Sequence, residues 1–474
     1  MRRIATAVLT VALAACAALA QSITGQVTDT GVPAERQRAV RVLPAPDLAR
    51  GVNFGNMLEA PFEGAWGLTV EERFFDIAVQ AGMDHIRLPV SWTHHAAETA
   101  PYTIDPVFMD RVRWCVDQAL ARGLTIIVNV HHYDELNADP IAEGPRFLAI
   151  WAQIAAEFAG DRPTLLFEVL NEPHGVFNDQ PALWDAALAD ALTVIRRTNP
   201  RRWVLAGPVR WNAIGALSTF NPPADDHLML AVHYYEPFAF THQGASWVDP
   251  SPPVGTGWTG DAIGLSGLYQ NWSWNTTVTP GVGGLNVQYN GGWAGVYLRR
   301  DGELAGVSRV EIELDAALQL NVTAGLDGAQ ITRTIQAQPG RNTVTFDPPV
   351  LLSNRIQIQN STPNPVAPFT LSAVEVTHAA GVERAIVTER KAIESAIAEA
   401  AAWARARRMP VHLGEFGAFS PAAMPDRAAW TRTVREAAER NRMAWAYWEL
   451  AAGFGFFDPA AGVFREPLLD ALTD

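Results

Sequence analysis

From residue 50 onward the chain alternates between short apolar segments and longer amphipathic segments. Eight apolar runs have the length of strands, at residues 51–55, 85–90, 124–130, 165–170, 203–206, 228–233, 410–414 and 443–448. Segments with a helical period lie between them, at residues 69–81, 106–122, 144–160, 181–198, 388–408 and 426–441. Apolar strands alternating with helices indicate a parallel sheet covered by helices. Eight such strands, each followed by a helix, predict an α/β fold of the closed (β/α)8, or TIM, barrel type.

Residues 261–386 depart from this alternation, because the helical period disappears. Short alternating segments take its place, at residues 285–289, 295–299, 309–315, 319–324, 342–347, 354–359 and 369–377. Gly, Asp, Asn and Pro turns separate them, which is typical of an all-β sandwich of seven or eight strands. We therefore expect a barrel built from residues 45–260 and 387–474, with the sandwich inserted between its sixth and seventh strands.

The N-terminal residues resemble a bacterial export signal. A positive start is followed by an apolar stretch and by small residues up to Ala20, which predicts a signal peptide over residues 1–20 and a linker over 21–44. The alternative is a lipobox that ends at Cys16, whose side chain would then be lipidated. We expect a secreted, periplasmic or cell-surface protein with no membrane span, since no other hydrophobic segment is long enough.

Composition narrows the class of partner. Acidic residues outnumber basic ones by 50 to 36, giving a net charge of -14 without a basic run, which argues against a nucleic-acid partner. The 16 tryptophans suit both a core and the flat faces of sugar rings. Outside the signal there is one cysteine, Cys115, so no internal disulfide is expected. We expect Cys115 to be a buried hydrophobe and the protein to be a monomer.

Polar and aromatic residues follow most of the predicted strands, where a barrel places its active site. Glu172 ends the fourth strand and Glu415 the seventh, so the two face each other across the barrel mouth. Glycoside hydrolysis needs such a pair, and a separation of about 5 Å is the retaining arrangement. Arg87 and Tyr235 beside Glu415 would favour its charged form, whereas Glu172 would keep a raised pKa as acid and then base.

Asn171 is placed to donate a hydrogen bond to the sugar 2-hydroxyl. A metal is the alternative for paired histidines such as His131 and His132. Since the chain has no His-Glu-x-x-His helix and no cysteine ligands, we expect neither a metal nor another cofactor.

Eight ordered segments closely resemble glycoside hydrolase family 5, the endoglucanase and mannanase family. They are residues 50–60, 87–92, 131–133, 170–174 (LNEPH), 233–235, 240–247, 414–417 (GEFG) and 446–449. The resemblance implies that Glu172 is the acid/base and Glu415 the nucleophile. It implies supporting roles for Arg87, His131, Asn171, His233, Tyr235 and Trp448, with Trp448 as the stacking platform. It further implies sugar contacts for Asn56, Glu59, His132 and Trp247.

The sandwich loosely resembles carbohydrate-binding modules. Its candidate sugar-binding rings are Trp272, Trp274, Trp293 and Tyr297. The alternative for each ring is burial in the sandwich core.

The sequence thus predicts a retaining endo-β-1,4-glucanase of the cellulase type, acting on a β-linked polysaccharide. The alternatives with the same two glutamates are a β-mannanase, a xyloglucanase or a mixed-linkage glucanase. A non-catalytic polysaccharide-binding protein is the alternative from a different class. Sequence does not decide between the sugars, because one hydroxyl contact can determine specificity.

Overall fold

The computed structural model describes residue 46 and residues 48–474. The predicted signal peptide, the lipobox at Cys16 and the linker over 21–44 lie outside the described residues.

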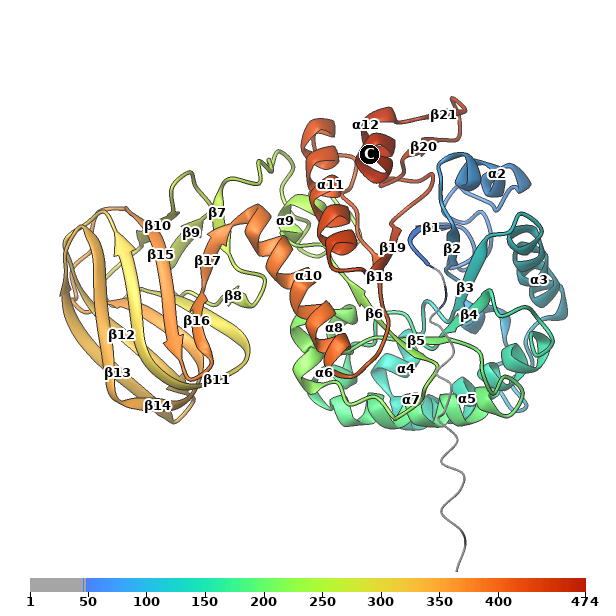
Figure 1. The fold of residues 1–474 in the computed structure, drawn as a ribbon, viewed down its shortest axis with the longest axis horizontal. Helices are drawn as coiled ribbons and strands as arrows, with labels where there is room; N and C mark the ends of the chain where they lie inside the picture. Colours follow the sequence, from blue (N-terminus) through green and yellow to red (C-terminus); the bar gives the residue numbers. More distant parts are fainter. Residues whose placement is uncertain (1–45, 47) are drawn as a thin grey trace, which may run out of the picture. The chain divides into compact units, whose positions relative to one another are not determined.

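Eight parallel strands close into a barrel, in the order β1-β19-β18-β6-β5-β4-β3-β2. They are β1 (Arg50–Asn53), β2 (His85–Leu88), β3 (Thr125–Asn129), β4 (Leu165–Glu168), β5 (Val204–Ala206), β6 (Leu228–His233), β18 (Val411–Glu415) and β19 (Ala444–Tyr447). Helices surround these strands (Figure 1). The predicted (β/α)8 barrel is confirmed.

All six predicted helices are present. They are α2 (Glu72–Gln80), α3 (Pro106–Ala121), α5 (Pro140–Glu157), α7 (Pro181–Arg196), α10 (Glu389–Ala406) and α11 (Met424–Arg440). The side chains of Asp105, Asp139 and Thr388 accept backbone N–H groups at the starts of α3, α5 and α10, which satisfies donors that have no partner inside the helix.

The expectation that every strand is followed by a helix is wrong after β5. Only the four-residue α8 (Val209–Asn212) and a 3₁₀ turn (Ile214–Thr219) follow it. Shorter elements complete the barrel domain: α4 (Asp134–Ala138), α6 (Val176–Asp179), α9 (Phe238–Thr241), α12 (Glu466–Thr473), a 3₁₀ turn (Trp92–His95), and the strand pair β20 (Phe457–Asp458) and β21 (Val463–Phe464).

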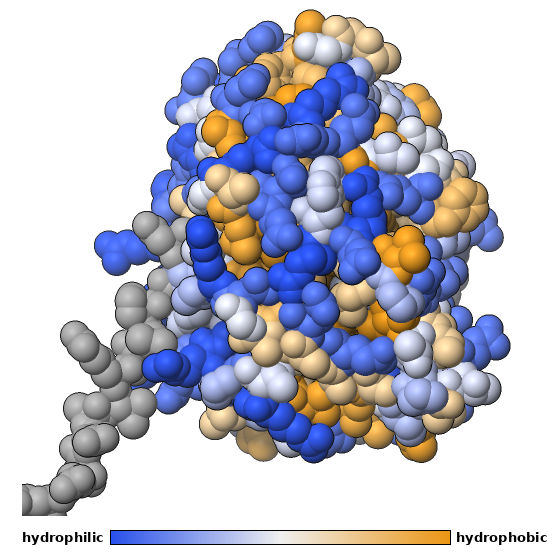
Figure 2. Space-filling model, turned by 90° about the vertical axis from the view of Figure 1, so that its right-hand side faces the viewer, coloured by the Kyte–Doolittle hydropathy of each residue, from blue (hydrophilic) through white to orange (hydrophobic). Residues whose placement is uncertain are grey.

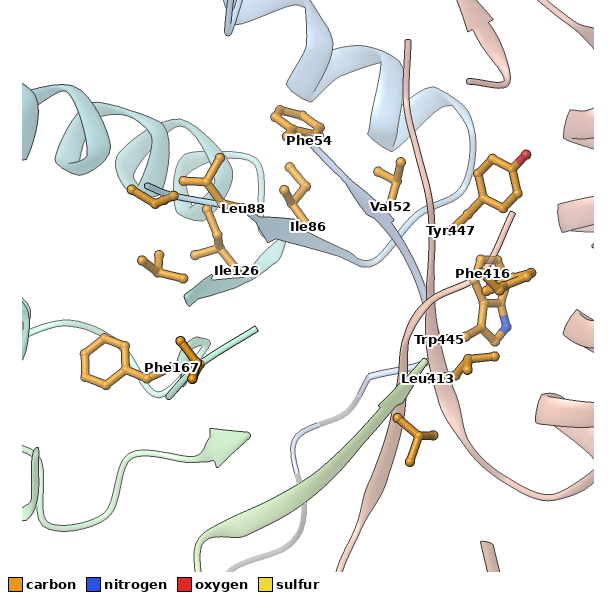
Figure 3. Close-up of a cluster of buried hydrophobic side chains, with 14 of the residues drawn as sticks. Val52, Phe54, Ile86, Leu88, Ile126, Phe167, Leu413, Phe416, Trp445 and Tyr447 are labelled. Atoms are coloured by element: carbon orange, nitrogen blue, oxygen red, sulfur yellow. The ribbon is translucent and has the colours of Figure 1, made fainter. Parts of the chain in front are cut away.

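Alternation along each barrel strand separates two sets of side chains. One set belongs to the large apolar cluster shared with the helices, including Ile86, Leu88 and Phe167 (Figure 3). The second set consists of the residues that alternate with these along each strand, and it includes a smaller apolar cluster with Ile127 and Leu166. Towards the carboxyl ends of the strands this second set becomes polar, and it carries the charged and amide groups of the candidate site.

Between α9 and α10 the chain forms an all-β sandwich. Its strands are β8 (Tyr269–Asn271), β9 (Thr276–Thr279), β10 (Leu285–Tyr289), β11 (Gly295–Leu314), β12 (Leu318–Leu326), β13 (Ala329–Ala337), β14 (Gly340–Asn360), β15 (Phe369–His378) and β16 (Gly381–Arg384). The sandwich has its own buried cluster, separate from those of the barrel. At its base, β7 (Ile263–Leu265) pairs antiparallel with β17 (Ile386–Thr388).

Two pairs of predicted short strands are in fact single long strands. Segment 295–299 and all but the last residue of segment 309–315 fall within β11, and segments 342–347 and 354–359 both fall within β14. Register shifts interrupt the β11–β14 ladder between Arg299 and Leu304 and between Val307 and Arg309. Such irregularities bend a strand without ending it, so the alternation breaks in sequence while the strand continues.

Among the described residues, no helix combines the length and the apolar character required to span a bilayer. The face seen in Figure 2 carries hydrophobic residues in small patches among hydrophilic ones. Cys115 is a buried free cysteine, as expected, and burial raises the pKa of its thiol to about 12. It is therefore protonated and unreactive at neutral pH.

Candidate active site

Glu172 and Glu415 meet at the carboxyl ends of the barrel strands. Glu172 follows β4 with a positive φ of 51°, and Glu415 is the last residue of β18. A carboxylate oxygen of each and a ring nitrogen of His233 all lie within 4.8 Å of one another. His233 Nδ1 is 2.7 Å from Glu172 Oε1 and 3.8 Å from Glu415 Oε2. The two carboxyl groups thus share one small space.

Glu415 is held by hydrogen bonds at both oxygens. Arg87 Nη1 donates to Oε1 at 2.7 Å, and the Tyr235 hydroxyl donates to Oε2 at 3.0 Å. Charge-assisted hydrogen bonds of this kind fix the orientation of a carboxylate. The predicted placement of Arg87 and Tyr235 beside Glu415 agrees with these contacts.

Arg87, a fully buried residue of β2, forms hydrogen bonds with several other side chains of the site. Its guanidinium also donates to Asn53 Oδ1 at 2.8 Å and to Asn171 Oδ1 at 2.6 Å. Arg87 also donates to Glu168, from Nε to Oε2 at 2.6 Å and from Nη2 to Oε1 at 3.2 Å. Glu168 was not predicted from the sequence, although a single carboxylate inside the apolar β4 segment signals a buried ionic partner.

Burial and charge act in opposite directions on the two carboxyl groups. Burial raises the pKa of Glu172 to about 7, although the positive charge of Arg87 opposes it. Burial also raises the pKa of Glu415, against the opposing effects of His233 and Arg87. Burial lowers the pKa of His233 to about 4, so this ring is neutral at pH 7. A proton at neutral pH is therefore available on Glu172, which has one oxygen beside the His233 ring nitrogen, whereas the Arg87 guanidinium hydrogen-bonds to Glu415.

A row of aromatic rings leads away from the carboxyl pair on one side. Trp448 and His131 are stacked, with centroids 5.7 Å apart and planes 9° apart. His132 lies 4.7 Å from His131, and Trp66 lies 5.9 Å from His132. The indole of Trp66 is 48% exposed. The first three rings were predicted from the sequence to belong to the site, whereas Trp66, which lies in the loop after β1, was not.

Two further exposed tryptophans flank the site. Trp247 is 59% exposed and packs edge-on against Phe419 with centroids 4.9 Å apart. Trp211 is 52% exposed and stacks on His174 at 5.1 Å. Its backbone N–H donates to the carbonyl of Pro173, directly after Glu172. Trp211 was missed; its position just after β5 was the available signal.

Asn56, Glu59 and Glu449 form a hydrogen-bonded group in the loops after β1 and β19. The Glu59 carboxylate accepts the backbone N–H groups of Asn56 and Met57, the latter at 3.0 Å. Asn56 Nδ2 donates to Glu449 Oε2 at 2.7 Å, and the N–H of Phe454 donates to Glu449 Oε1 at 3.2 Å. Both carboxyl groups are buried, and burial raises the pKa of Glu59 to about 7 and of Glu449 to about 8. This group fixes the loop beside Trp448, whereas direct sugar contact by Asn56 or Glu59 stays a prediction.

Within the described part of the chain, one group of potential metal ligands lies close enough together, and it is Glu172, His233 and Glu415. The Arg87 guanidinium already provides Glu415 with a positive partner at 2.7 Å.

The four candidate rings of the sandwich are not part of this site, and they divide into two pairs. Trp272 and Trp293 are 54% and 50% exposed, whereas Tyr297 is buried and Trp274 is half-buried.

Comparison with known proteins gives a match to one family over the first six barrel strands. A family model described as Cellulase (glycosyl hydrolase family 5) matches residues 50–277. Endoglucanase H of Acetivibrio thermocellus is 42% identical over 196 residues, which are 41% of this chain and 22% of that protein. The chain spans between 22% and 56% of the length of the first three curated relatives that it matches.

Solved structures match over most of the chain. An endoglucanase is 30% identical, with a TM-score of 0.61 and coverage of 90% of this chain and 96% of that one. Cel5A of Thermotoga maritima is 28% identical, also with a TM-score of 0.61, covering 90% of this chain and 97% of that one. That protein has been solved in complexes with cellobiose and with mannotriose.

Proposed function

Because the chain belongs to glycosyl hydrolase family 5, we propose that it is a retaining endo-β-1,4-glucanase in which Glu415 is the nucleophile and Glu172 the acid/base. The observation that carries the proposal is the close approach of these two carboxyl groups, whose oxygens lie within 4.8 Å. Retaining enzymes place their carboxyl groups about 5–5.5 Å apart, whereas inverting enzymes leave room for a water between them.

In the first step Glu415 attacks the anomeric carbon while Glu172 transfers its proton to the glycosidic oxygen. The carbon–oxygen bond to the leaving chain breaks, and a covalent glycosyl ester forms on Glu415. Arg87 and Tyr235 hold Glu415 for this attack, since each donates to a different carboxylate oxygen. The raised pKa of Glu172, about 7, keeps a proton available at neutral pH.

In the second step Glu172, now a carboxylate, accepts a proton from water, and the resulting hydroxide attacks the anomeric carbon. The ester bond to Glu415 breaks, and the configuration at the anomeric carbon is restored. His233 supports both steps as a neutral ring 2.7 Å from Glu172, because it adds no positive charge that would hold Glu172 ionised.

Exposed rings on several sides of the carboxyl pair support attack within a long chain. Trp66 continues the row of Trp448, His131 and His132, and Trp211 stands next to the acid/base loop. A polymer lying across the pair would have a ring to stack on at both ends. This arrangement supports an endo-acting enzyme over one that binds only a chain end.

A second substrate, β-mannan, is favoured by one observation. Cel5A of Thermotoga maritima, similar to this chain over most of its length, was solved with mannotriose as well as with cellobiose. Glucose and mannose differ in the orientation of the 2-hydroxyl, next to which Asn171 would lie. The catalytic roles are the same for both sugars.

The test is reducing-sugar release from carboxymethylcellulose, barley β-glucan, xyloglucan and glucomannan by wild type, Glu172→Gln and Glu415→Gln. We expect cleavage of a glucan by wild type, none by Glu415→Gln, and a loss of roughly 10²–10⁴-fold with Glu172→Gln. Proton NMR of the first product should show the β-anomer. A matched control is Glu399→Gln, which removes a half-buried carboxyl on α10 and should leave the rate unchanged.

Initial release of the α-anomer would exclude the retaining assignment. Wild type that cleaves none of the four polymers would exclude the glucanase and favour the binding protein. Activity that survives EDTA with unchanged kcat is also expected, since the roles above use only side chains and water.

A further inference from the structure

We propose that the sandwich carries a second β-glucan site, on the sheet face that displays Trp272 and that Trp293 extends. The identity of the polymer rests on the proposed function, whereas the existence of the site rests on the contacts of the sandwich alone. The site would hold substrate without cleaving it.

The strand register shows which side chains share this face. Val296, Leu298, Ile356 and Ile358 are fully buried in the sandwich core, at 0–1% exposure. The residues between them must therefore point to the opposite side of the sheet. Tyr297 is paired with Gln357, and Gln357 with Thr323. The backbone N–H of Trp272 donates to the carbonyl of Tyr297 at 2.8 Å, which places Trp272 at the end of the same row.

A second row runs beside the first. Gln359 is paired with Gly295 on one side and with Asn321 on the other, and Asn321 is paired with Thr334. Trp274 is paired with Gly295 at the end of this row. Each row thus begins with an indole and continues with amides and hydroxyls.

The indoles of Trp272 and Trp274 are fixed before any ligand arrives. Trp272 donates from Nε1 to Gln270 at 3.1 Å, and the Arg299 guanidinium lies 5.2 Å from its ring. The Trp274 ring covers Gly295, where a Cβ would come within 2.3 Å of it, and its Nε1 donates to the carbonyl of Trp293 at 2.8 Å. Gln359 donates to that same carbonyl at 2.9 Å, which ties the Trp293 loop to the second row. Rigid rings lose little entropy on binding.

The chemistry of the face matches a neutral sugar polymer. Exposed apolar surface with a polar rim marks an interaction site when it is contiguous. The two rows carry no carboxylate, and the nearby arginines are already engaged, Arg299 with Trp272 and Arg355 with Asp327. A β-linked glucan offers apolar C–H faces for the rings and equatorial hydroxyls for the amides. Nucleic acid would require free positive charge instead.

A binding site in the same chain as the catalytic site changes how the enzyme meets a polymer. Once one site has bound the polysaccharide, the effective concentration of substrate at the other site is in the millimolar range. The benefit applies to polymer, because a short oligosaccharide cannot occupy both sites.

The experiment uses the full chain with Glu415→Gln, so that the polymer is not degraded. Native gels containing barley β-glucan measure retardation for this parent, for added Trp272→Ala/Trp293→Ala, and for the control Val282→Ala, which removes a 95% exposed apolar side chain elsewhere on the sandwich. We expect the double variant to raise the apparent Kd about tenfold, corresponding to one or two aromatic contacts. The control should migrate as the parent does, and Trp272→Tyr should retain most of the retardation because it keeps a ring.

A second measurement separates this site from the catalytic one. With Glu415 intact, Trp272→Ala/Trp293→Ala should keep kcat/KM on a short cellooligosaccharide and lose activity several-fold on polymer at low concentration. Unchanged retardation in the double variant overturns the proposal and leaves the glucanase assignment standing. Ring-dependent retardation without any cleavage by wild type overturns the glucanase and leaves the binding site standing. Retention by a protein ligand but not by glucan also overturns it.

Discussion

At the scale of single residues, the proton on Glu172 determines how activity depends on pH. Since burial raises its pKa to about 7, the protonated form that donates to the leaving group is lost as pH rises through that value. We predict that kcat/KM for a glucan falls about tenfold per pH unit above roughly pH 7–8. Steady-state kinetics between pH 5 and 10 check this.

An aryl cellobioside with an acidic phenol provides the control, because its leaving group needs little protonation. For this substrate the alkaline limb should be weak in wild type, and Glu172→Gln should retain a measurable rate with no alkaline limb. If the limb stays in Glu172→Gln, another group carries it and the acid/base assignment is wrong.

Arg87 and Glu168 form a buried ion pair whose two halves depend on each other. Both side chains are fully buried, with Arg87 Nε 2.6 Å from Glu168 Oε2. We predict that Arg87→Met lowers the free energy of unfolding by about 3–5 kcal/mol, because it leaves the buried carboxyl groups of Glu168 and Glu415 without their arginine partner. Urea unfolding followed by tryptophan fluorescence measures the change.

The double variant Arg87→Met/Glu168→Gln tests that reason. Replacing the Glu168 carboxyl group by an amide should recover part of the free energy of unfolding that Arg87→Met loses. Such non-additive behaviour is expected for residues in contact. A double variant as unstable as the sum of the two single ones would mean that packing, not charge, explains the effect.

At the scale of elements, the loops after β1 and β19 are joined by Asn56 and Glu449. Burial raises the pKa of Glu449 from 4.5 to about 8, so the folded state holds a proton that the unfolded chain releases. Stability from this group is therefore full below about pH 4.5 and declines as pH rises towards 8, by an amount on the order of a few kcal/mol. We predict that Glu449→Gln, which cannot ionise, flattens the dependence of unfolding free energy on pH between 5 and 8.

Denaturant unfolding at several pH values measures this slope. The variant should be more stable than wild type at pH 8 relative to pH 5, because the introduced amide would pair with the Asn56 side chain at every pH. An exposed matched change, Glu72→Gln, should leave the slope unaltered. Equal slopes in Glu449→Gln and wild type would contradict the prediction.

The elements differ in how clearly their sequences predict them. The barrel strands could be predicted because each is a continuous apolar run, and the positions of Glu172 and Glu415 because one follows such a run and the other ends one. Strand β13 could not be predicted from the sequence, since its side chains alternate between exposed and half-buried without a strong apolar face. Trp66 lies in a loop whose path depends on tertiary packing, so no local pattern placed it near the site, whereas the position of Trp211 just after β5 was a usable signal.

At the scale of the whole described chain, the barrel and the sandwich have separate buried clusters. The two ends of the inserted segment meet in a short ladder, with Leu265 paired to Ile386 and Ile263 to Thr388. An inserted segment with adjacent ends and a separate hydrophobic core contributes little to the packing of the domain into which it is inserted. The barrel therefore does not need the sandwich in order to bury its own apolar residues.

We predict that replacing residues 266–385 by Asn-Gly yields a folded barrel. Asn-Gly favours the two-residue turn that closes an antiparallel pair, so β7 and β17 would become a hairpin and α10 would keep its Thr388 cap. The shortened chain should unfold cooperatively and hydrolyse short cellooligosaccharides at a rate within about threefold of the full chain, while losing retardation in glucan gels. Circular dichroism, thermal unfolding and oligosaccharide kinetics check the three statements. Loss of oligosaccharide activity in a cooperatively folded deletion variant would mean that the sandwich contributes to the catalytic site itself.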